Sequence, residues 1–298
     1  MTHTNGSPVV SSPASAAAGA RKPPVTAMIY TLNEEQNLPA CLDSLAWCDD
    51  VIVIDSFSTD RTEAICRERG VRFFQHAFEG FGSQRNWAAA HTSPRHEWIL
   101  VLDADERVPP EMVTEMAERL ASAPPEVAAY RLKRRFHLWG RWLRHSSLYP
   151  TWVVRLIRRD RVRYVNRGHA ETQEVQGETA ELESDLIDEN AKGILEWFER
   201  QTRYARKDAE FELSEEDEPF RLGDVLSSDP LVRRAALKRI ARRAPGRAPV
   251  YFAYSYLLRG GFRDGEDGLV FCTMRALYQQ MVNIHKYDLR KRAAGKDG

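Results

Sequence analysis

The stretch Trp98-Ile-Leu-Val-Leu-Asp-Ala-Asp-Glu106 decides the fold and points to the chemistry. Its first five residues are apolar and have the length of a strand, which predicts a strand buried on both faces. Asp103 and Asp105 follow this strand directly, one residue apart. On extended backbone such side chains project the same way, so the two carboxylates can share one hard cation and its waters. Alone the pair is a weak signal, because acidic residues also cap strands and helices.

The preceding part of the chain alternates strand-like and helix-like segments. Apolar residues recur at helical spacing from Leu38 to Leu45, with Asn33 as a candidate cap, and the helix-like Arg61–Arg69 ends at Gly70, a typical C-cap residue. Three further apolar runs predict strands: Thr26–Tyr30, Asp50–Asp55 and Val71–Gln75. This alternation indicates an α/β fold with a mainly parallel, Rossmann-like sheet and helices on both faces, whose chemistry lies at the carboxyl ends of the strands.

The second half of the chain has a different pattern. Ala128–Phe136 alternates apolar and polar residues as a half-buried strand does, Lys192–Glu210 is helical in spacing, and Ser214–Glu218 is an acidic break. The first residues are rich in Ser, Ala, Pro and Gly without periodicity. The expected organisation is a disordered tail over 1–22, an α/β catalytic domain over 23–212 and a helical C-terminal extension over 213–298.

Composition is that of an ordinary soluble globular enzyme. Of the 298 residues, 43% are hydrophobic and 29% are charged. No run approaches the roughly eighteen apolar residues that span a bilayer, and no signal peptide is visible. The four cysteines have neither metal nor redox spacing, which indicates reduced thiols in the core. These features predict a cytoplasmic protein.

The net charge is zero, but the charges are unevenly distributed. Arg131–Arg167 holds twelve Lys and Arg and one acid, residues 171–218 are acidic, and the chain is basic again from Arg221 onward. Such blocks are either solvated faces or surfaces for charged partners. Arg233–Arg247 could make peripheral contact with an anionic membrane, although it has no clean apolar face. Zero net charge and the lack of a recognition motif argue against nucleic acid.

Four ordered motifs carry a resemblance to a known family. They are Tyr30-Thr-Leu-Asn-Glu-Glu-Gln-Asn37, Val53-Ile-Asp-Ser-Phe-Ser-Thr-Asp-Arg-Thr62, Gly80-Phe-Gly-Ser-Gln-Arg-Asn86 and Leu102-Asp-Ala-Asp-Glu-Arg107. The series resembles family 2 glycosyltransferases, most of all the branch that includes lipopolysaccharide-core glucosyltransferases. The likeness covers roughly residues 25–210. It implies a GT-A fold and an inverting transferase that uses Mg²⁺ or Mn²⁺.

The resemblance implies that Asp103, Ala104 and Asp105 hold the diphosphate of a nucleotide-sugar. Asp105 would bind the metal directly. Asp103 would bind it through water or hold the ribose.

The resemblance also implies donor contacts from the other motifs. Thr31, Glu34 and Asp55 would contact the base and ribose, Arg85 would approach the diphosphate, and Asn86 would hold a sugar or loop group. Charge at a helix N-terminus is an alternative role for Glu34. A surface salt bridge is the alternative for Arg85.

An inverting transfer also needs a base that takes the proton of the acceptor hydroxyl. Related sequences carry a His-Glu pair, whereas this chain has Gly168-His-Ala-Glu-Thr-Gln-Glu174. Glu171 is the favoured base and Glu174 the alternative. His169 is a candidate metal ligand, a residue that orients the base, or a structural histidine. Asp188 stands where relatives often carry His and could also meet the metal.

The resemblance implies transfer of a hexose, with glucose favoured, from a UDP-sugar to a hydroxyl of a cell-envelope glycan or a lipid-linked acceptor. Two other functions stay open. A nucleotidyltransferase would need a Gly-rich basic phosphate loop where this chain has Thr31-Leu-Asn-Glu-Glu35. A catalytically inactive glycan- or lipid-binding protein would not need the acidic motifs.

Overall fold

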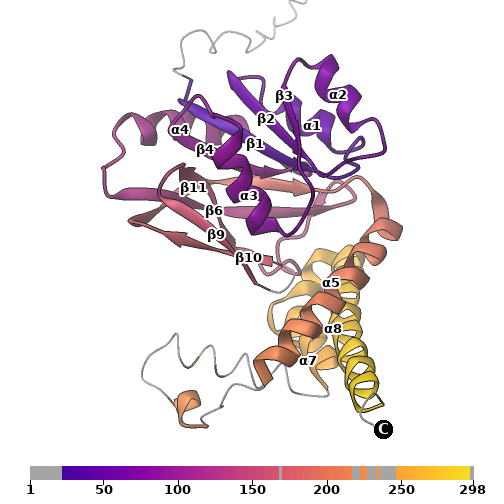
Figure 1. Cartoon of the computed structure of the whole chain (residues 1–298). Helices are drawn as coiled ribbons and strands as arrows, with labels where there is room; N and C mark the ends of the chain where they lie inside the picture. Colours follow the sequence, from indigo (N-terminus) through magenta and orange to yellow (C-terminus); the bar gives the residue numbers. More distant parts are fainter. Residues whose placement is uncertain are drawn as a thin grey trace, which may run out of the picture.

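The computed structural model describes residues 22–167, 170–216, 222–226, 233, 236 and 246–295. Figure 1 shows a layered α/β body with the helices α5, α7 and α8 gathered below it. The tail expected over residues 1–22 lies outside the described residues except for Lys22.

The first half of the main sheet is parallel. Its strands lie in the order β3-β2-β1-β4 and are β1 (Val25–Thr31), β2 (Asp50–Asp55), β3 (Arg72–Gln75) and β4 (Trp98–Asp103). The register places Thr31 opposite Asp55 and Tyr30 opposite Asp103. The carboxyl ends of β1, β2 and β4 therefore meet at one edge of the sheet.

Helices cover both faces of this half: α1 (Leu38–Asp43), α2 (Thr62–Glu68), α3 (Phe81–His91) and α4 (Pro110–Ala121). Apolar side chains of α1, α2 and α4 share one buried cluster with Val53 and Leu100. Ala88 of α3 packs with Ile52 and Ile99 in a second cluster, because adjacent strand residues point to opposite faces. The expected α/β fold, with a Rossmann-like sheet and helices on both faces, is confirmed.

The helix after β1 begins later than the sequence suggested, and Asn33 is not its cap. Asn33 has a φ of 55°, and its Oδ1 accepts a hydrogen bond from the backbone N of Thr59 at 2.8 Å. The helix α1 begins at Leu38, after Asn37. Asparagine tolerates left-handed backbone and often bonds to nearby loops, which here prevails over helix capping. Asn33 thus ties the loop after β1 to the loop after β2.

The second half of the main sheet is mixed. It contains β5 (Glu106–Arg107), β6 (Val127–Leu138), β7 (Arg141–Trp142), β8 (Thr151–Arg158) and β11 (Glu178–Glu189). β8 lies antiparallel between β4 and β6, β11 runs parallel to β6, and β5 pairs antiparallel with β11. Asp188 stands opposite Glu106 in this last pairing, which brings the end of β11 to the acidic motif.

A separate antiparallel hairpin consists of β9 (Val162–Arg167) and β10 (Ala170–Val175). Tyr164 of β9 belongs to the buried cluster that includes Ala88 of α3. Asn86 of α3 fastens the hairpin, since its side chain accepts from Tyr164 N at 2.9 Å and donates to Tyr164 O at 2.8 Å. The hairpin is therefore held on the same face of the sheet as α3.

The C-terminal region is helical, as expected. It comprises α5 (Gly193–Glu216), η1 (Leu222–Leu226), α7 (Arg247–Ala253), η2 (Tyr254–Leu258), η3 (Gly261–Asp264) and α8 (Gly265–Ala294). Ala205 and Ala209 of α5 pack on Tyr278 and Val282 of α8. The boundary expected at 212/213 falls inside α5, so we propose that the helical region begins at Gly193. Among the described helices, none is long and apolar enough to cross a membrane.

Gly268 tests how tightly η3 packs on α8. A Cβ at this position would lie 2.2 Å from the backbone oxygen of Gly261. Alanine normally stabilises a helix by about 1 kcal/mol relative to glycine. Here we expect the opposite sign, a loss of about 1–3 kcal/mol from overpacking, and thus a lower Tm for Gly268→Ala in a thermal melt.

Gly295→Ala is the matched control, because its Cβ would meet nothing closer than 3.4 Å. An unchanged or higher Tm for Gly268→Ala would show that this packing is loose.

Candidate functional site

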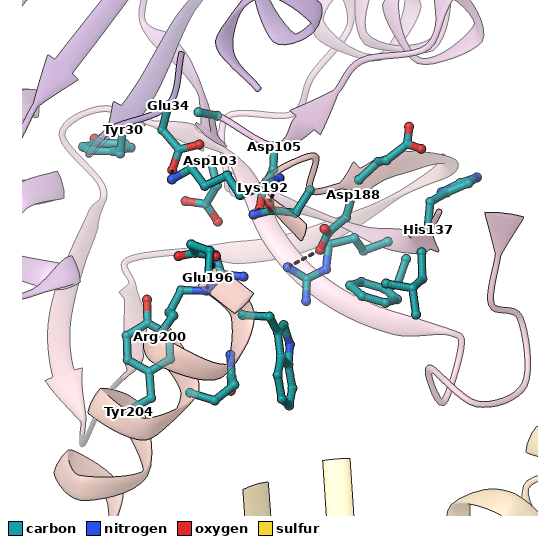
Figure 2. A pocket seen from close by; sticks show the side chains of 18 of the residues that line it. Tyr30, Glu34, Asp103, Asp105, His137, Asp188, Lys192, Glu196, Arg200 and Tyr204 are labelled. Atoms are coloured by element: carbon teal, nitrogen blue, oxygen red, sulfur yellow. Dashed lines mark hydrogen bonds and ion pairs between the residues drawn. The ribbon is translucent and has the colours of Figure 1, made fainter. Parts of the chain in front are cut away.

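A cavity of about 1590 Å³ opens at the carboxyl ends of β1 and β4. Figure 2 shows side chains that reach it from separate elements: Glu34 after β1, Asp103 at the end of β4, Asp105 after β4, Asp188 from β11 and Arg200 from α5. Groups of both charges, far apart in the sequence, thus converge on one space.

Asp103 is held by two arginines. Its Oδ1 lies 3.1 Å from Nη2 of Arg85, and its Oδ2 lies 2.6 Å from Nη2 of Arg155. Burial alone would raise the pKa of this carboxyl, but Arg155 and Arg85 hold the pKa well below its usual range. Asp103 is therefore ionised, and both of its oxygens already have cationic partners.

Arg155 also fixes the turn that follows Asp103. Its Nη2 lies 2.6 Å from Oε1 of the fully buried Glu106. The other oxygen of Glu106 accepts a hydrogen bond from the backbone N of Asp103 at 3.0 Å. One guanidinium from β8 therefore contacts two carboxylates and helps to set the backbone of the acidic motif.

Asp105 has different partners. Its Oδ2 accepts a hydrogen bond from Nδ2 of Asn190 at 2.9 Å, and its side chain is partly exposed to the cavity. Across the part of the chain that the structure describes, no Lys or Arg forms an ion pair with it. Asp105 is the member of the acidic pair that remains available to a cation.

Asp188 lies beside Asp105, because the backbone N of its neighbour Glu189 donates to Asp105 O at 2.9 Å. Oδ2 of Asp188 is 3.1 Å from Nη1 of Arg134 (Figure 2). Burial raises the pKa of Asp188 to about 7; Arg134 opposes this rise, and Asp105 adds to it. A bound cation would stabilise the charged form of this side chain.

These carboxylates fit a divalent cation that a substrate helps to hold. Within the described ranges, no group of three or more His, Cys, Asp or Glu could bind a metal by itself. Mg²⁺ at nucleotide sites is commonly held by one or two carboxylates together with phosphates and waters. Asp105 with Asp188 nearby offers that kind of partial site.

Thr31 and Asp55 form a buried pair at the edge of the cavity. Oγ1 of Thr31 donates to Oδ1 of Asp55 at 2.8 Å, and Oδ2 of Asp55 accepts from the backbone N of Ser58 at 2.8 Å. Thr31 lines the cavity, whereas Asp55 is fully buried and is not among the described residues that line it. Asp55 therefore positions Thr31 and the loop after β2, and a direct donor contact from Asp55 has no support in this arrangement.

Glu34 faces the cavity and pairs with a lysine. Its Oε1 lies 2.6 Å from Nζ of Lys192, which also donates to the backbone oxygen of Leu32 at 3.2 Å. Burial raises the pKa of Glu34, and Lys192 opposes the rise. The pair connects the loop after β1 to the start of α5.

Arg85 reaches the cavity from α3. Its guanidinium lies 5.5 Å and 5.4 Å from the ring centroids of Tyr30 and Tyr164, and it pairs with Asp103 and with Glu171 of β10. The Arg85 side chain is only 4% exposed, so it does not form a surface salt bridge. It links the acidic motif to the β9–β10 hairpin.

The two candidate bases lie on opposite faces of β10. Glu171 and Gln173 line the cavity, whereas Glu174 is exposed and is not among the described lining residues. This follows from the alternation of side chains along a strand. The candidate ligand His169 lies outside the described residues.

Ala104 and Asn86 differ in their access to the cavity. Ala104 lines it, although it is nearly buried. Asn86 is not among the described lining residues, and its amide bonds to the backbone of Tyr164. Of the two expected roles for Asn86, the arrangement favours holding a loop group over holding a sugar.

Sequence reasoning missed several charged side chains of the cavity: Arg134, Arg155, Lys192, Glu196 and Arg200. Arg155 had a visible signal, since it interrupts the apolar strand sequence Val153-Val-Arg-Leu-Ile157. Glu196 and Arg200 share a helix face at i, i+4, but that spacing is common on exposed helices. Nothing in the sequence pointed α5 toward the acidic motif.

Comparison with known proteins finds a family whose model matches this chain. The family model described as Glycosyl transferase family 2 matches residues 26–179. The lipopolysaccharide core biosynthesis glycosyltransferase LpsC of Rhizobium meliloti is 33% identical over 148 residues, which cover 48% of this chain and 54% of that protein. The undecaprenyl-phosphate 4-deoxy-4-formamido-L-arabinose transferase of Pseudomonas aeruginosa is 27% identical over 131 residues, 40% of this chain and 38% of that protein. The chain thus spans about half the length, or less, of these curated relatives.

Solved structures are similar at low sequence identity. Glucosyl-3-phosphoglycerate synthase from Mycobacterium tuberculosis, in complex with Mn²⁺, UDP and phosphoglyceric acid, is 18% identical with a TM-score of 0.43; the match covers 66% of this chain and 80% of that one. Residues 1–349 of TarS from S. aureus are 16% identical with a TM-score of 0.39, covering 90% and 91%. The family assignment therefore rests on the family model.

That model covers just over half of the chain, residues 26–179 of 298. The matched segment includes the cavity residues Thr31, Asp105 and Glu171. The prediction of a family 2 glycosyltransferase is confirmed, and the chain belongs to glycosyl transferase family 2.

Proposed function

We propose that this chain transfers a hexose, with glucose favoured, from a UDP-sugar to a hydroxyl of a cell-envelope glycan or lipid-linked acceptor, with inversion at the anomeric carbon. One observation carries the metal-dependent part of this proposal. Asp103 is neutralised by Arg85 and Arg155, whereas Asp105 faces the cavity without an ion-pair partner among the described residues.

The proposed cation is Mg²⁺ or Mn²⁺, with Asp105 as its direct ligand and Asp188 as the second carboxylate. When bound, such an ion would supply Lewis-acid stabilisation of the negative charge on the departing nucleotide. Asp103 would act through Arg85 and Arg155, which it holds in place, rather than as a direct ligand.

The donor would lie between the loop after β1 and α5. Thr31 and Glu34 are the proposed contacts to base and ribose, because both line the cavity at the carboxyl end of β1. Arg200 is a proposed diphosphate contact. Its Nε is buried without a hydrogen-bond partner, and the nearest atom of Glu196 is 3.8 Å away. A diphosphate oxygen would supply the missing acceptor.

Glu171 is the proposed base. Its carboxylate lines the cavity and pairs with Arg85. Because Arg85 also pairs with Asp103, a single guanidinium group separates Glu171 from the acidic motif. A carboxylate placed there could accept the proton of an acceptor hydroxyl as the new bond forms. Glu174 points away from the cavity and is the weaker candidate.

The acceptor is proposed from the size of the cavity and from the relatives. A typical ligand pocket has roughly 300–1,000 Å³, so a cavity of about 1590 Å³ has room for a donor and an acceptor together. The names of the two curated relatives refer to a lipopolysaccharide core and to undecaprenyl phosphate. Both support an acceptor of the cell envelope, and the second supports a lipid-linked one.

Asp105→Asn tests the metal claim. The amide keeps the shape of the side chain but removes the charge that would hold the cation. We expect UDP release from UDP-glucose with Mn²⁺ to fall at least about a hundredfold, since a bound metal contributes several kcal/mol to transition-state stabilisation. EDTA should abolish the activity of the wild type.

Asp160→Asn is the control, because Asp160 is 79% exposed and pairs only with its neighbour Arg159 in the described structure. Full turnover in EDTA, or a fully active Asp105→Asn, would remove the metal from the proposal.

Glu171→Gln tests the base. The amide keeps size and hydrogen bonding but cannot take a proton, so kcat should fall about 10²- to 10⁴-fold while the affinity for UDP-glucose barely changes. Glu174→Gln is the matched control on the opposite face of β10 and should be mild. Reversed results would make Glu174 the base, and two active variants would place the base outside this strand.

Asn86→Ala separates a loop role from a sugar contact. The variant leaves the backbone N and O of Tyr164 without their side-chain partner, which loosens the hairpin that carries Glu171. We expect a lower Tm and a lower kcat with an unchanged KM for UDP-glucose. A tenfold rise in KM at constant kcat and Tm would instead show a direct donor contact.

A further inference from the structure

Large apolar side chains are exposed where α7 continues into η2 and the chain turns into η3. They are Val250 (66% exposed), Tyr254 (43%), Leu257 (60%), Leu258 (81%) and Phe262 (50%), and we call this surface the α7–η2 corner. They come from consecutive elements: Val250 lies in α7, Tyr254, Leu257 and Leu258 lie in the π-helical turn η2, and Phe262 lies in η3. Exposed apolar groups gathered in this way mark an interaction surface.

The corner is firmly attached to the catalytic domain. Oδ2 of Asp264 accepts hydrogen bonds from the backbone N of His145 at 2.9 Å and from the backbone N and Oγ of Ser146 at 2.7 Å each. A Cβ at Gly261 would lie 2.8 Å from the backbone oxygen of Ser255, so η2 and η3 are in close contact. The exposed leucines are therefore presented by packed structure rather than by a loose end.

The exposed charged side chains within the corner are basic, whereas Glu266 and Asp267 follow it at the start of α8. Arg259 directly follows Leu258, and Arg263 directly follows Phe262 and lies over its ring at 5.8 Å. Both arginines are exposed. Apolar side chains flanked by arginines match a surface with an apolar interior and anionic headgroups.

The corner also borders the cavity. Tyr251, next to Val250 in α7, lines the cavity, as do Phe271 and Met274 of α8. A body that meets the corner would therefore lie close to the cavity.

We infer that the α7–η2 corner docks on an anionic phospholipid bilayer. Leu257, Leu258 and Phe262 enter the boundary between headgroups and acyl chains, and Arg259 and Arg263 meet lipid phosphates. The inference rests on the proposed function, because docking on a bilayer would bring the chain to a lipid-linked acceptor. It replaces the basic stretch Arg233–Arg247, which lacks an apolar face, as the primary membrane contact.

The test is co-sedimentation of the full chain with vesicles of phosphatidylglycerol and phosphatidylethanolamine, compared with vesicles of phosphatidylcholine. The wild type should bind the anionic vesicles at least about tenfold more tightly. The double variant Leu257→Glu, Leu258→Glu should lose at least tenfold of that binding. Arg259→Gln with Arg263→Gln should reduce the preference for anionic lipid.

Ile284→Glu is the matched control. Ile284 is 56% exposed but lies nineteen residues along α8 from Gly265, about 28 Å at the rise of an α-helix. It should bind vesicles as the wild type does. An equal loss in Ile284→Glu, or a wild type that stays in the supernatant, would overturn the inference.

A second copy of the chain is the competing occupant. Light scattering could show that the wild type is a dimer and that the leucine double variant is a monomer. If the wild type also fails to bind vesicles, this result would overturn membrane docking in favour of self-association. UDP release without vesicles should be unchanged in that variant. If neither the wild type nor the double variant releases UDP but the wild type still binds vesicles, the proposed transferase activity fails and the membrane contact stands.

Discussion

A guanidinium group from β8 lies between two carboxylates of the turn that follows β4. Arg155 contacts both Asp103 and Glu106 at 2.6 Å; the side chains of Arg155 and Glu106 are buried, whereas that of Asp103 is 36% exposed. Burying Glu106 without a cationic partner would cost several kcal/mol, so the turn could not keep this shape without the arginine. The shape matters because it leaves Asp105 facing the cavity while Asp103 is used for structure.

Ion pairs also connect the other elements that surround the cavity. Arg85 joins Asp103 to Glu171, Arg134 accompanies Asp188, and Lys192 accompanies Glu34. These ion pairs bring together the parallel half of the sheet, the mixed half, the hairpin and α5. They also leave the cavity nearly balanced in charge before any substrate enters. Asp105 has no ion-pair partner among the described residues, which is why the proposed metal site is placed there.

The parallel half of the fold was predictable because its signals are local. Trp98–Leu102 is an apolar run that the structure buries and that Asp103 follows. Asp50–Asp55 is buried except for the partly buried Val51 and ends in Asp55. The roles of those aspartates were not predictable, because their partners come from distant segments. Arg155 lies 52 residues beyond Asp103, and its contact depends on an antiparallel pairing that no local pattern reveals. To tell which of Glu171 and Glu174 faces the cavity, one needs only the position of β10 and the alternation of side chains along it.

A structure with UDP and Mn²⁺ would test the central claim most directly. The account predicts that a carboxylate oxygen of Asp105 enters the inner coordination sphere of the ion, while Asp103 keeps its contacts with Arg85 and Arg155. An ion bound by Asp103, with those arginines displaced and Asp105 still paired only with Asn190, would contradict the account.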